Sequence, residues 1–384
     1  MENKNIICVS VSDWLKPWGS KQHLMVKLAQ RNRVLYVEYQ GSFLDIVKYP
    51  RYFLTRFCRI NRVRKINANI YLYTPVPGFP FGNYSIFINR INQAILSFAL
   101  RRIIKKLEFN DPVLWVYSPS SVELAGRLNE RAIIYHCAAD FTNEKKNRLR
   151  QRTIDRLQAR LVKEAKIVLT LTRGLQERFI KLNRNTFYFP SAADTEYFNI
   201  IREGNNEEPV DLAVLPKPRL SVVGYLDGNI LDISLLDYIA KADPGLSIVM
   251  IGPLFRNGSA LIRLRQNKNV HFLGEKHPSM IPLYLKYSDI CLIPYVRNEF
   301  TKSVSPIKLY EYLAMGKPVI STSFSDEISV CSRIIGIAGC KEEFLRLIRA
   351  SLDHKNDEKS FMARIEFASL NSWQNRVEFL GGLI

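Results

Sequence analysis

Short apolar runs alternate with amphipathic stretches along this 384-residue chain. Near its start, the apolar runs at 6–11 and 34–38 have the length and composition of buried parallel strands, and they flank a helical pattern at 22–30. A strand, a helix and a strand in such close succession form a βαβ unit, which predicts a doubly wound α/β sheet. The first half contains further predicted strands at 112–117, 132–137 and 167–171.

The second half of the chain repeats this pattern. Predicted strands at 220–223, 247–251, 270–273 and 290–293 are each followed by glycine or proline, as expected of loops at the carboxyl ends of parallel strands. Because 384 residues exceed what one core normally organises, we predict two domains. The predicted bounds are 1–201 for the first domain, 202–218 for a linker with Gly, Asn and Pro, 219–365 for the second domain and 366–384 for a C-terminal helix.

Composition adds a strong positive charge to this picture. An apolar fraction of 47% is ample for packed cores, while 55 Lys and Arg against 36 Asp and Glu give a formal charge of +19. This charge indicates a polyanionic partner or an anionic membrane surface. The six cysteines lack metal-binding or disulfide spacing, so we expect reduced thiols. With neither a signal peptide nor an apolar run of the ~18 residues that a membrane span needs, we expect a cytoplasmic protein.

The basic residues are concentrated in the segment 46–107, which contains twelve Lys or Arg and no Asp or Glu. Aromatic residues are interleaved with them, a mixture suited to anionic headgroups and the membrane interface. The segment therefore predicts peripheral binding to the inner face of the cell membrane. The alternative is a nucleic-acid-binding protein, although no RRM, KH or zinc-finger pattern occurs. The residues assigned to membrane binding are Arg51, Arg56, Arg59, Arg62, Arg64, Lys65, Arg101 and Arg102.

The stretch SPIKLYEYLAMGKPVIST reads as a short helix followed by a strand, with Ser305 as N-cap and Pro306 as the first helical residue. Lys308 then falls in the first turn, where the helix dipole disfavours a cation unless an anion docks beside it. Together with the free backbone N–H groups, this lysine predicts a phosphate or diphosphate site. Glu311, one turn further, could accept hydrogen bonds from a ribose diol, so the pattern suits a nucleotide-sugar. The alternative is a solvent-facing Lys308–Glu311 ion pair worth ~0.2–0.5 kcal/mol.

Two sequence motifs are absent, and each absence argues against one class of ligand. No GxGxxG occurs, so we expect no dinucleotide cofactor. No Asp-x-Asp occurs either, so we expect no metal ion to bridge a diphosphate. We therefore predict that the protein uses no cofactor and that the nucleotide-sugar is its substrate.

The run SPIKLYEYLAMGKPV resembles the donor-site segment of GT-B glycosyltransferases of family 4, and especially a subgroup linked to teichuronic acid and exopolysaccharide assembly. The resemblance implies two Rossmann-like doubly wound domains with a cleft between them, and a C-terminal helix that crosses back to the first domain. Many family members carry two glutamates here. This chain keeps the second glutamate as Glu311 and has Ser303 near the place of the first. The family's preference for a particular donor sugar therefore cannot be assigned to this chain.

The resemblance also implies roles for residues of the first, acceptor-binding domain. The loop with Trp18, Gly19 and Gln22 resembles the subgroup's opening segment, and packing against the sheet is its alternative role. At the end of the fourth predicted strand, YHCAADF stands where the subgroup tends toward YDCVDDF. His136 and Asp140 are therefore the catalytic candidates, able to take the acceptor proton or hold a donor hydroxyl. A structural histidine is the alternative for His136.

In the second domain, the resemblance assigns the diphosphate, ribose and base to one group of residues. Many family members have Arg and Lys after the first strand, but this chain has GYLDGNILD, which leaves more of the phosphate contact to Lys308. The predicted donor-binding residues are Lys308, Glu311, Pro306, Ile307, Tyr310, Gly224, Tyr225, Gly274 and Arg297.

The implied activity is metal-independent transfer of a sugar from a nucleoside-diphosphate sugar to a lipid-linked or polysaccharide acceptor at the cytoplasmic membrane face. A UDP-sugar is favoured over a GDP-sugar. Three alternatives stay open: a GT-B nucleotide-sugar epimerase, a nucleic-acid-binding protein, and a catalytically silent GT-B relative that serves as an assembly partner.

Overall fold

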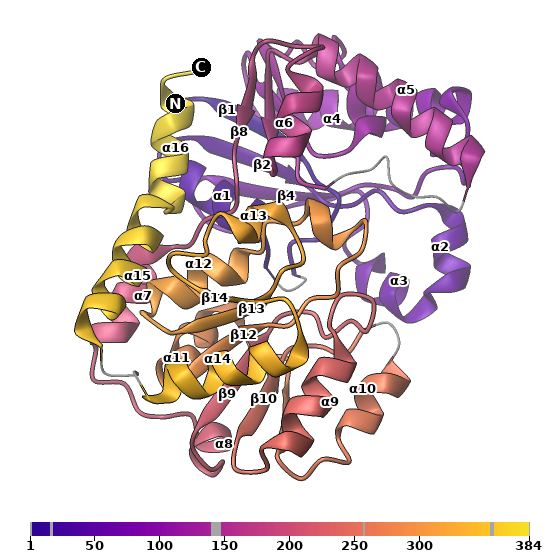
Figure 1. Cartoon of the computed structure of the whole chain (residues 1–384). Coiled ribbons are helices and arrows are strands. Elements are labelled where there is room, and N and C mark those ends of the chain that lie inside the picture. Colours follow the sequence, from indigo (N-terminus) through magenta and orange to yellow (C-terminus); the bar gives the residue numbers. More distant parts are fainter. Residues whose placement is uncertain (1, 16–17, 140–146, 256–257, 354–356, 384) are drawn as a thin grey trace. The chain divides into compact units, whose positions relative to one another are not determined.

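The computed structural model of the chain describes residues 2–15, 18–139, 147–255, 258–353 and 357–383 (Figure 1). The chain divides into two compact units. Unit 1 consists of Met1–Pro190 and Val377–Ile384, and unit 2 is Ser191–Arg376. Each unit has its own mainly parallel sheet and its own hydrophobic core. None of the helices among the described residues has the length and hydropathy needed to span a bilayer.

Unit 1 is built on an eight-stranded sheet in the order β3-β4-β2-β1-β5-β6-β7-β8. Every neighbouring pair is parallel except β3 and β4, which are antiparallel. The central strands are continuous apolar runs because both of their faces are covered. The strands are β1 (Asn5–Val9), β2 (Arg33–Val37), β3 (Arg62–Lys65), β4 (Ile70–Thr74), β5 (Val113–Val116), β6 (Ala132–Cys137), β7 (Ile167–Thr170) and β8 (Thr186–Tyr188).

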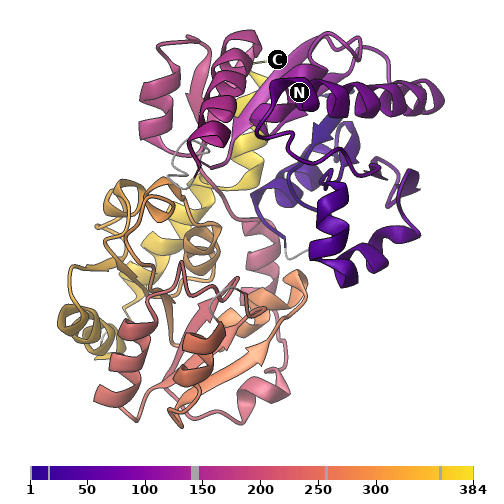
Figure 2. The same cartoon turned by 90° about the vertical axis from the view of Figure 1, so that its right-hand side faces the viewer.

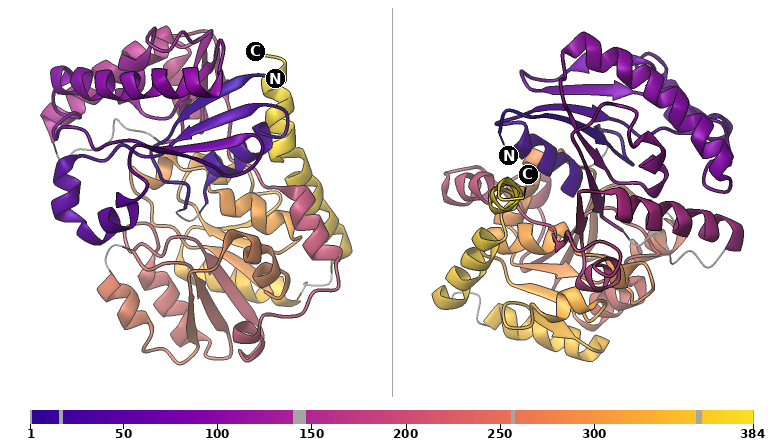
Figure 3. Two further views of the ribbon diagram at one scale, coloured as in Figure 1. Left: turned by 180° about the vertical axis from the view of Figure 1, so that it is seen from behind. Right: turned by 90° about the horizontal axis from the view of Figure 1, so that it is seen from above.

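Helices connect these strands (Figures 2 and 3), and those at 86–107, 148–164 and 173–179 bury apolar residues in the core of the unit. The unit 1 helices are α1 (Ser20–Leu28), α2 (Phe43–Lys48), α3 (Pro50–Phe57), α4 (Ile86–Leu107), the short 3-10 helix η1 (Pro119–Leu124), α5 (Arg148–Glu164) and α6 (Arg173–Phe179). The last helix, α16 (Trp373–Gly381), begins in unit 2 and ends in unit 1. There the ring of Phe379 contacts those of Phe187 and Phe189.

Unit 2 is a six-stranded, fully parallel sheet in the order β11-β10-β9-β12-β13-β14. Alternate residues of its strands enter two different clusters: Val223 and Ile251 pack in one, and Val222 and Met250 in the other, so helices cover both faces. The strands are β9 (Arg219–Val223), β10 (Ser247–Ile251), β11 (Val270–Gly274), β12 (Ile290–Ile293), β13 (Val319–Thr322) and β14 (Gly336–Ala338).

The connections of unit 2 place a switch in strand order at β9, which has β10 on one side and β12 on the other. In doubly wound sheets, ligands bind outside the carboxyl ends of the strands at such a point. The helices are α7 (Thr195–Glu203), α8 (Val210–Ala213), α9 (Ile233–Ala242), α10 (Gly258–Leu264), η2 (Pro278–Met280), α11 (Ile281–Lys286), η3 (Thr301–Ser303), α12 (Ile307–Ala314), α13 (Asp326–Ser329), α14 (Lys341–Asp353) and α15 (Glu358–Leu370).

The boundary between the units differs from the predicted one. Unit 2 begins at Ser191, and the segment 202–218, predicted as a linker, is packed into unit 2. Arg202 donates a hydrogen bond to the carbonyl of Ala314 at 2.6 Å, and Asp211 of α8 pairs with Lys276 at 2.6 Å. Its glycine, asparagines and prolines mark turns between docked helices, which composition alone does not distinguish from a free linker.

Candidate functional site

The helix α12 carries the predicted phosphate-binding lysine. It begins at Ile307, with Pro306 in extended backbone conformation as its N-cap, so the helix starts one residue later than predicted. The carbonyl of the preceding Ser305 is buried and accepts a hydrogen bond from the hydroxyl of Ser191 at 2.9 Å. Lys308 is therefore the second helical residue, beside the backbone N–H groups at the positive end of the helix dipole.

The other end of α12 is held by two arginines. Gly316 has φ +67°, a left-handed conformation that ends the helix where the sequence predicted. Arg202 donates to the carbonyl of Ala314 at 2.6 Å, and Arg364 donates to that of Gly316 at 2.8 Å. Cations suit this negative end of the dipole. The helix is thus fixed at its far end, while no side chain among the described residues caps its first turn.

A tyrosine fixes α12 to the switch-point strand. The backbone N–H of Val223, the last residue of β9, donates to the hydroxyl of Tyr312 at 3.0 Å. Lys308, Glu311 and Tyr312 are three and four residues apart, so they share one face of the helix. This face lies over the turn after β9, where a Cβ added to Gly224 would lie 4.0 Å from Cε of Lys308. Two predicted donor-binding residues, Lys308 and Gly224, are therefore neighbours.

Lys308 and Glu311 form a partly buried ion pair. Their Nζ and Oε2 atoms are 2.6 Å apart, and their side chains are 16% and 6% exposed. The alternative of a solvent-facing pair therefore does not describe this site, because both side chains are largely withdrawn from water. Burial, with the charge of Glu311 second, raises the pKa of the neighbouring Tyr295 to about 12, so its hydroxyl stays protonated.

Three glycines lie at the carboxyl ends of β9, β10 and β11. Gly224, Gly252 and Gly274 have φ of +138°, +143° and +72°, values that side chains disfavour. A Cβ on Gly252 would lie 1.8 Å from the carbonyl oxygen of Gly224, and the N–H of Gly252 donates to the carbonyl of Gly274 at 2.8 Å. The three glycines therefore form a connected backbone surface at the carboxyl edge of the sheet, which a ligand can approach closely.

Other predicted donor residues are placed less favourably for direct contact. Tyr310 is buried in the core and stacks on Phe367 with 6.5 Å between ring centroids, which makes it a packing residue rather than a ligand contact. Ile307 is half-buried on the first turn of α12. Tyr225, after β9, is 41% exposed, and Arg297 is exposed on the loop that leads to α12.

In unit 1, the loop before α1 is held by the predicted acceptor residues themselves. The side-chain oxygen of Gln22 accepts from the N–H of Gly19 at 3.1 Å, and its amide nitrogen donates to the carbonyl of Asp13 at 3.1 Å. Gln22 is buried, so the structure gives it a loop-fixing role. Trp18 is half-exposed and makes edge contacts with Trp14, whereas Gly19 has open space on its Cβ side.

His136, one catalytic candidate, is enclosed at the end of β6. Its ring is tilted against that of Tyr117 at 4.9 Å between centroids, and Phe189 contacts its edge at 5.3 Å. Neither ring nitrogen has a hydrogen-bond partner among the described residues. Burial, with a smaller effect of Lys21, lowers the pKa of His136 to about 3, so the imidazole is neutral at pH 7. The catalytic role of His136 stays a prediction, and the burial of its ring disfavours that role. The other catalytic candidate, Asp140, lies outside the described residues.

The predicted membrane-binding residues divide into exposed and buried groups. Arg56 is only 2% exposed; its guanidinium lies 3.6 Å from the carboxylate of Asp13 and donates to the carbonyl of Tyr39 at 2.7 Å. The membrane assignment of Arg56 is therefore wrong. Arg64 pairs with the buried Glu38 at 3.3 Å. Arg59 is half-buried, and the exposed members are Arg51, Arg62, Lys65, Arg101 and Arg102.

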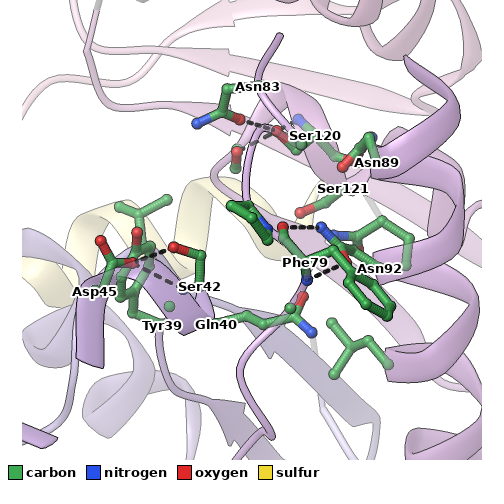
Figure 4. A pocket seen from close by; sticks show the side chains of 18 of the residues that line it. Tyr39, Gln40, Ser42, Asp45, Phe79, Asn83, Asn89, Asn92, Ser120 and Ser121 are labelled. Atoms are coloured by element: carbon green, nitrogen blue, oxygen red, sulfur yellow. Dashed lines mark hydrogen bonds between the residues drawn. The ribbon is translucent and has the colours of Figure 1, made fainter. Parts of the chain in front are cut away.

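Sequence reasoning missed a cavity of about 310 Å³ within unit 1 (Figure 4). It lies at the carboxyl ends of β1 and β2, and α4 contributes the amides of Asn89, Asn92 and Gln93 to its wall. The available signal was the spacing of these amides, three and four residues apart in an otherwise apolar helical pattern. Such spacing places them on one helix face, which is buried here.

Comparisons with known proteins agree with this geometry. Residues 221–344, which contain the glycine turns and α12, match the family described as Glycosyl transferases group 1. A putative teichuronic acid biosynthesis glycosyltransferase of Bacillus subtilis (strain 168), TuaH, is 31% identical over 121 residues, or 31% of this chain. The aligned part spans 30% of that relative's length. These matches confirm the resemblance predicted from the sequence.

Solved structures show the fold of the whole chain. Sucrose-phosphate synthase from Thermosynechococcus elongatus has a TM-score of 0.71 at 14% identity, covering 99% of this chain and 98% of that chain. HepE of Anabaena in complex with UDP has a TM-score of 0.65 at 14% identity, with the same coverage. The predicted fold class is confirmed: the chain has the GT-B fold of two Rossmann-like units, and its residues 221–344 match the Glycosyl transferases group 1 family.

Proposed function

We propose that this protein is a glycosyltransferase that moves a sugar from a nucleoside-diphosphate sugar to an acceptor bound by unit 1. The observation that carries the proposal is the partly buried Lys308–Glu311 pair above Gly224, inside the family match at 221–344. In an empty site the two side chains neutralise each other. A diphosphate would give the ammonium a second anionic partner, and a ribose diol would give the carboxylate hydrogen-bond donors.

The proposed step breaks the bond between the anomeric carbon and the diphosphate oxygen and forms a bond from that carbon to an acceptor hydroxyl oxygen. The proton of that hydroxyl is released, so the products are the glycoside, the nucleoside diphosphate and one proton. Negative charge develops on the leaving diphosphate. Lys308 and the first N–H groups of α12 stabilise this charge without reorganisation, because the far end of the helix is fixed by Arg202 and Arg364. Gly274 leaves open space for the nucleotide base against the backbone.

The acceptor is proposed to be a lipid-linked or polysaccharide glycan at the cytoplasmic membrane face. The name of the Bacillus subtilis relative supports a cell-envelope polysaccharide, and the basic segment of unit 1 supports an anionic surface. The helices α2 and α3 carry exposed large apolar residues between these cations, including Val47 at 78%, Leu54 at 74% and Phe57 at 77% exposure. Exposed apolar residues beside cations suit the interface of an anionic bilayer.

We expect nucleotide binding to raise the midpoint of thermal unfolding. UDP and UDP-sugars at a hundred times their dissociation constant should stabilise the folded protein by ~2.7 kcal/mol, and the corresponding guanosine compounds at the same concentrations should do less. The measurement is a thermal-shift screen of nucleotide-sugars, followed by assay of UDP release with and without glycan acceptor. Absence of any shift with every nucleoside diphosphate would contradict the proposed donor site.

We expect the protein to float with vesicles that contain an anionic lipid and not with neutral vesicles, because each cation near an anionic surface adds ~1 kcal/mol. Replacing the exposed apolar pair Leu54 and Phe57 by serine should reduce binding to the anionic vesicles at least tenfold. Val210→Ser, at an 82% exposed position of unit 2, is the matched control. Equal flotation with neutral and anionic vesicles would count against the membrane proposal.

A further inference from the structure

The cavity of unit 1 lies where a doubly wound sheet binds ligands. Val9 and Val37, the last residues of β1 and β2, are part of its lining, so it opens at the carboxyl ends of two central strands. Its volume of about 310 Å³ is at the small end of ligand sites, suited to one compact group. Among the described residues, neither His136 nor the loop residues Trp18, Gly19 and Gln22 are part of this lining.

The wall facing this space is rich in uncharged hydrogen-bonding groups. Asn83, Asn89, Asn92 and Gln93 supply amides, and Ser120 and Ser121 supply hydroxyls. Figure 4 shows the asparagines and serines converging from α4, η1 and the 78–84 loop. Amides and hydroxyls both donate and accept, which matches the paired donor and acceptor character of sugar hydroxyls.

Two of the α4 amides are used by the protein itself. Asn92 donates to the carbonyl of Phe79 at 2.9 Å and accepts from its N–H at 2.7 Å, which fixes the 78–84 loop. Asn89 donates to the carbonyl of Ser120 at 2.9 Å. Gln93 differs: its side chain is buried, and its Oε1 has no hydrogen-bond partner among the described residues. A buried acceptor without a partner is costly, so a ligand hydroxyl that donates to it would bind favourably.

The cavity is not basic, in contrast to the chain as a whole. Lys48 is the one cation among the described residues that line it, and Asp45 is also in the lining. The carboxylate of Glu38 accepts from the N–H of Trp14 at 3.0 Å and pairs with Arg64 at 3.3 Å, so its charge is compensated. This balance favours an uncharged ligand over a phosphate or an acidic sugar.

Aromatic side chains in the lining are partly exposed. Tyr39, Phe79 and Phe81 are 39%, 50% and 57% exposed. Ring faces of this kind pack on the apolar C–H faces of sugar rings. Leu44 of α2, also in the lining, is 39% exposed and continues the apolar surface of that helix.

We propose that this cavity binds a neutral sugar unit of the acceptor, with Gln93 as a hydrogen-bond acceptor for one of its hydroxyls. The proposal rests on the proposed function, which assigns the acceptor to unit 1. It moves the acceptor contact from the loop with Trp18, Gly19 and Gln22 to the face of α4 and the 78–84 loop.

The test uses the full chain and two sets of probes. Methyl glycosides of neutral hexoses and of N-acetylhexosamines are titrated by saturation-transfer NMR, beside glucuronate and glucose 6-phosphate as anionic probes. We expect the best neutral glycoside to bind at least fivefold more tightly than either anionic probe. Gln93→Leu should weaken its binding at least fivefold, as should Tyr39→Leu, which removes a ring without changing a buried amide.

Gln151→Leu is the matched control, because Gln151 also has a side-chain oxygen without a partner among the described residues but does not line this cavity. Its glycoside binding should equal that of the wild type. Octyl glycosides below their micelle concentration separate two sources of the sugar: tighter binding than the methyl glycoside indicates a lipid-linked glycan, and equal binding a soluble one.

The proposal is overturned if no neutral glycoside binds, if the anionic probes bind more tightly, or if Gln93→Leu and Tyr39→Leu both bind as the wild type does. UDP binding is measured on the same samples. UDP binding without glycoside binding removes this inference alone. Glycoside binding that depends on Gln93 without UDP binding removes the proposed donor site and leaves the cavity as a sugar site.

Discussion

Lys308→Ala should lower the turnover number about 100-fold or more, because one electrostatic contact to a developing negative charge is worth ~3 kcal/mol. The loss should appear mainly in kcat, since charge on the leaving diphosphate grows as the glycosidic bond breaks. Steady-state release of the nucleoside diphosphate at saturating donor is the measurement.

The variant leaves Glu311 buried without its partner, so a general loss of stability has to be separated from a loss of charge stabilisation. Lys302→Ala is the matched control: Lys302 and Glu299 have the same three-residue spacing at 3.2 Å, but both side chains are 47% exposed. Lys302→Ala should retain normal turnover. Thermal unfolding of both variants shows whether Lys308→Ala is folded, and near-normal turnover in folded Lys308→Ala would remove the phosphate role.

Glu311 has a different expected effect, which sharpens the test of Lys308. If the carboxylate holds the ribose equally in the ground state and the transition state, Glu311→Gln should raise the KM for the donor more than it lowers kcat. The contrast between the two variants distinguishes a diphosphate contact from a general disturbance of α12.

The donor helix could be predicted from sequence because its signals are local. Proline at the start, glycine at the end and the Lys308–Glu311 spacing all act within one short segment, and the structure shifts the start by one residue only. The apolar strands of both sheets were likewise predictable, since burial on both faces gives each strand a continuous apolar run. The resemblance to a known family supplied the GT-B arrangement, which these local signals do not contain.

Side-chain burial was less predictable because it depends on contacts between distant segments. Gln22 and Arg56 look like surface residues in the sequence. In the structure, however, Gln22 donates a hydrogen bond to the carbonyl of Asp13, and Arg56 pairs with the carboxylate of Asp13. Likewise, the family resemblance assigns Tyr310 to donor binding, but its ring stacks on that of Phe367, more than fifty residues later. No local pattern reports such long-range partners.

The amides of the unit 1 cavity were missed for a related reason. Asn89, Asn92 and Gln93 look like interruptions of an apolar helix, and the sequence does not show that the 78–84 loop folds onto them. Without that loop, the buried amides would not enclose a binding cavity. With the loop in place, they form one wall of the cavity.

Arg56→Ala should lower the local stability of unit 1 by ~3–5 kcal/mol, because removing one partner of a buried ion pair leaves Asp13 as an uncompensated charge. The same variant also loses the hydrogen bonds from Arg56 to the carbonyl of Tyr39 and to the hydroxyl of Tyr52, at 2.7 and 3.0 Å. Hydrogen exchange of α3 and of the 10–15 loop, followed by mass spectrometry, is the measurement, since a chain of two units need not unfold in one step.

The matched control is Arg51→Ala, which changes an exposed arginine of the same helix and should alter protection of α3 by less than ~0.5 kcal/mol. Asp13→Asn placed in the Arg56→Ala background should recover part of the lost stability, because it replaces the unpaired carboxylate by an uncharged amide of the same shape. If Arg56→Ala keeps the protection of the wild type and loses only vesicle binding, Arg56 acts at the membrane after all. Loss of protection that Asp13→Asn partly restores assigns it instead to the core of unit 1, where it holds the loop after β1 against α3.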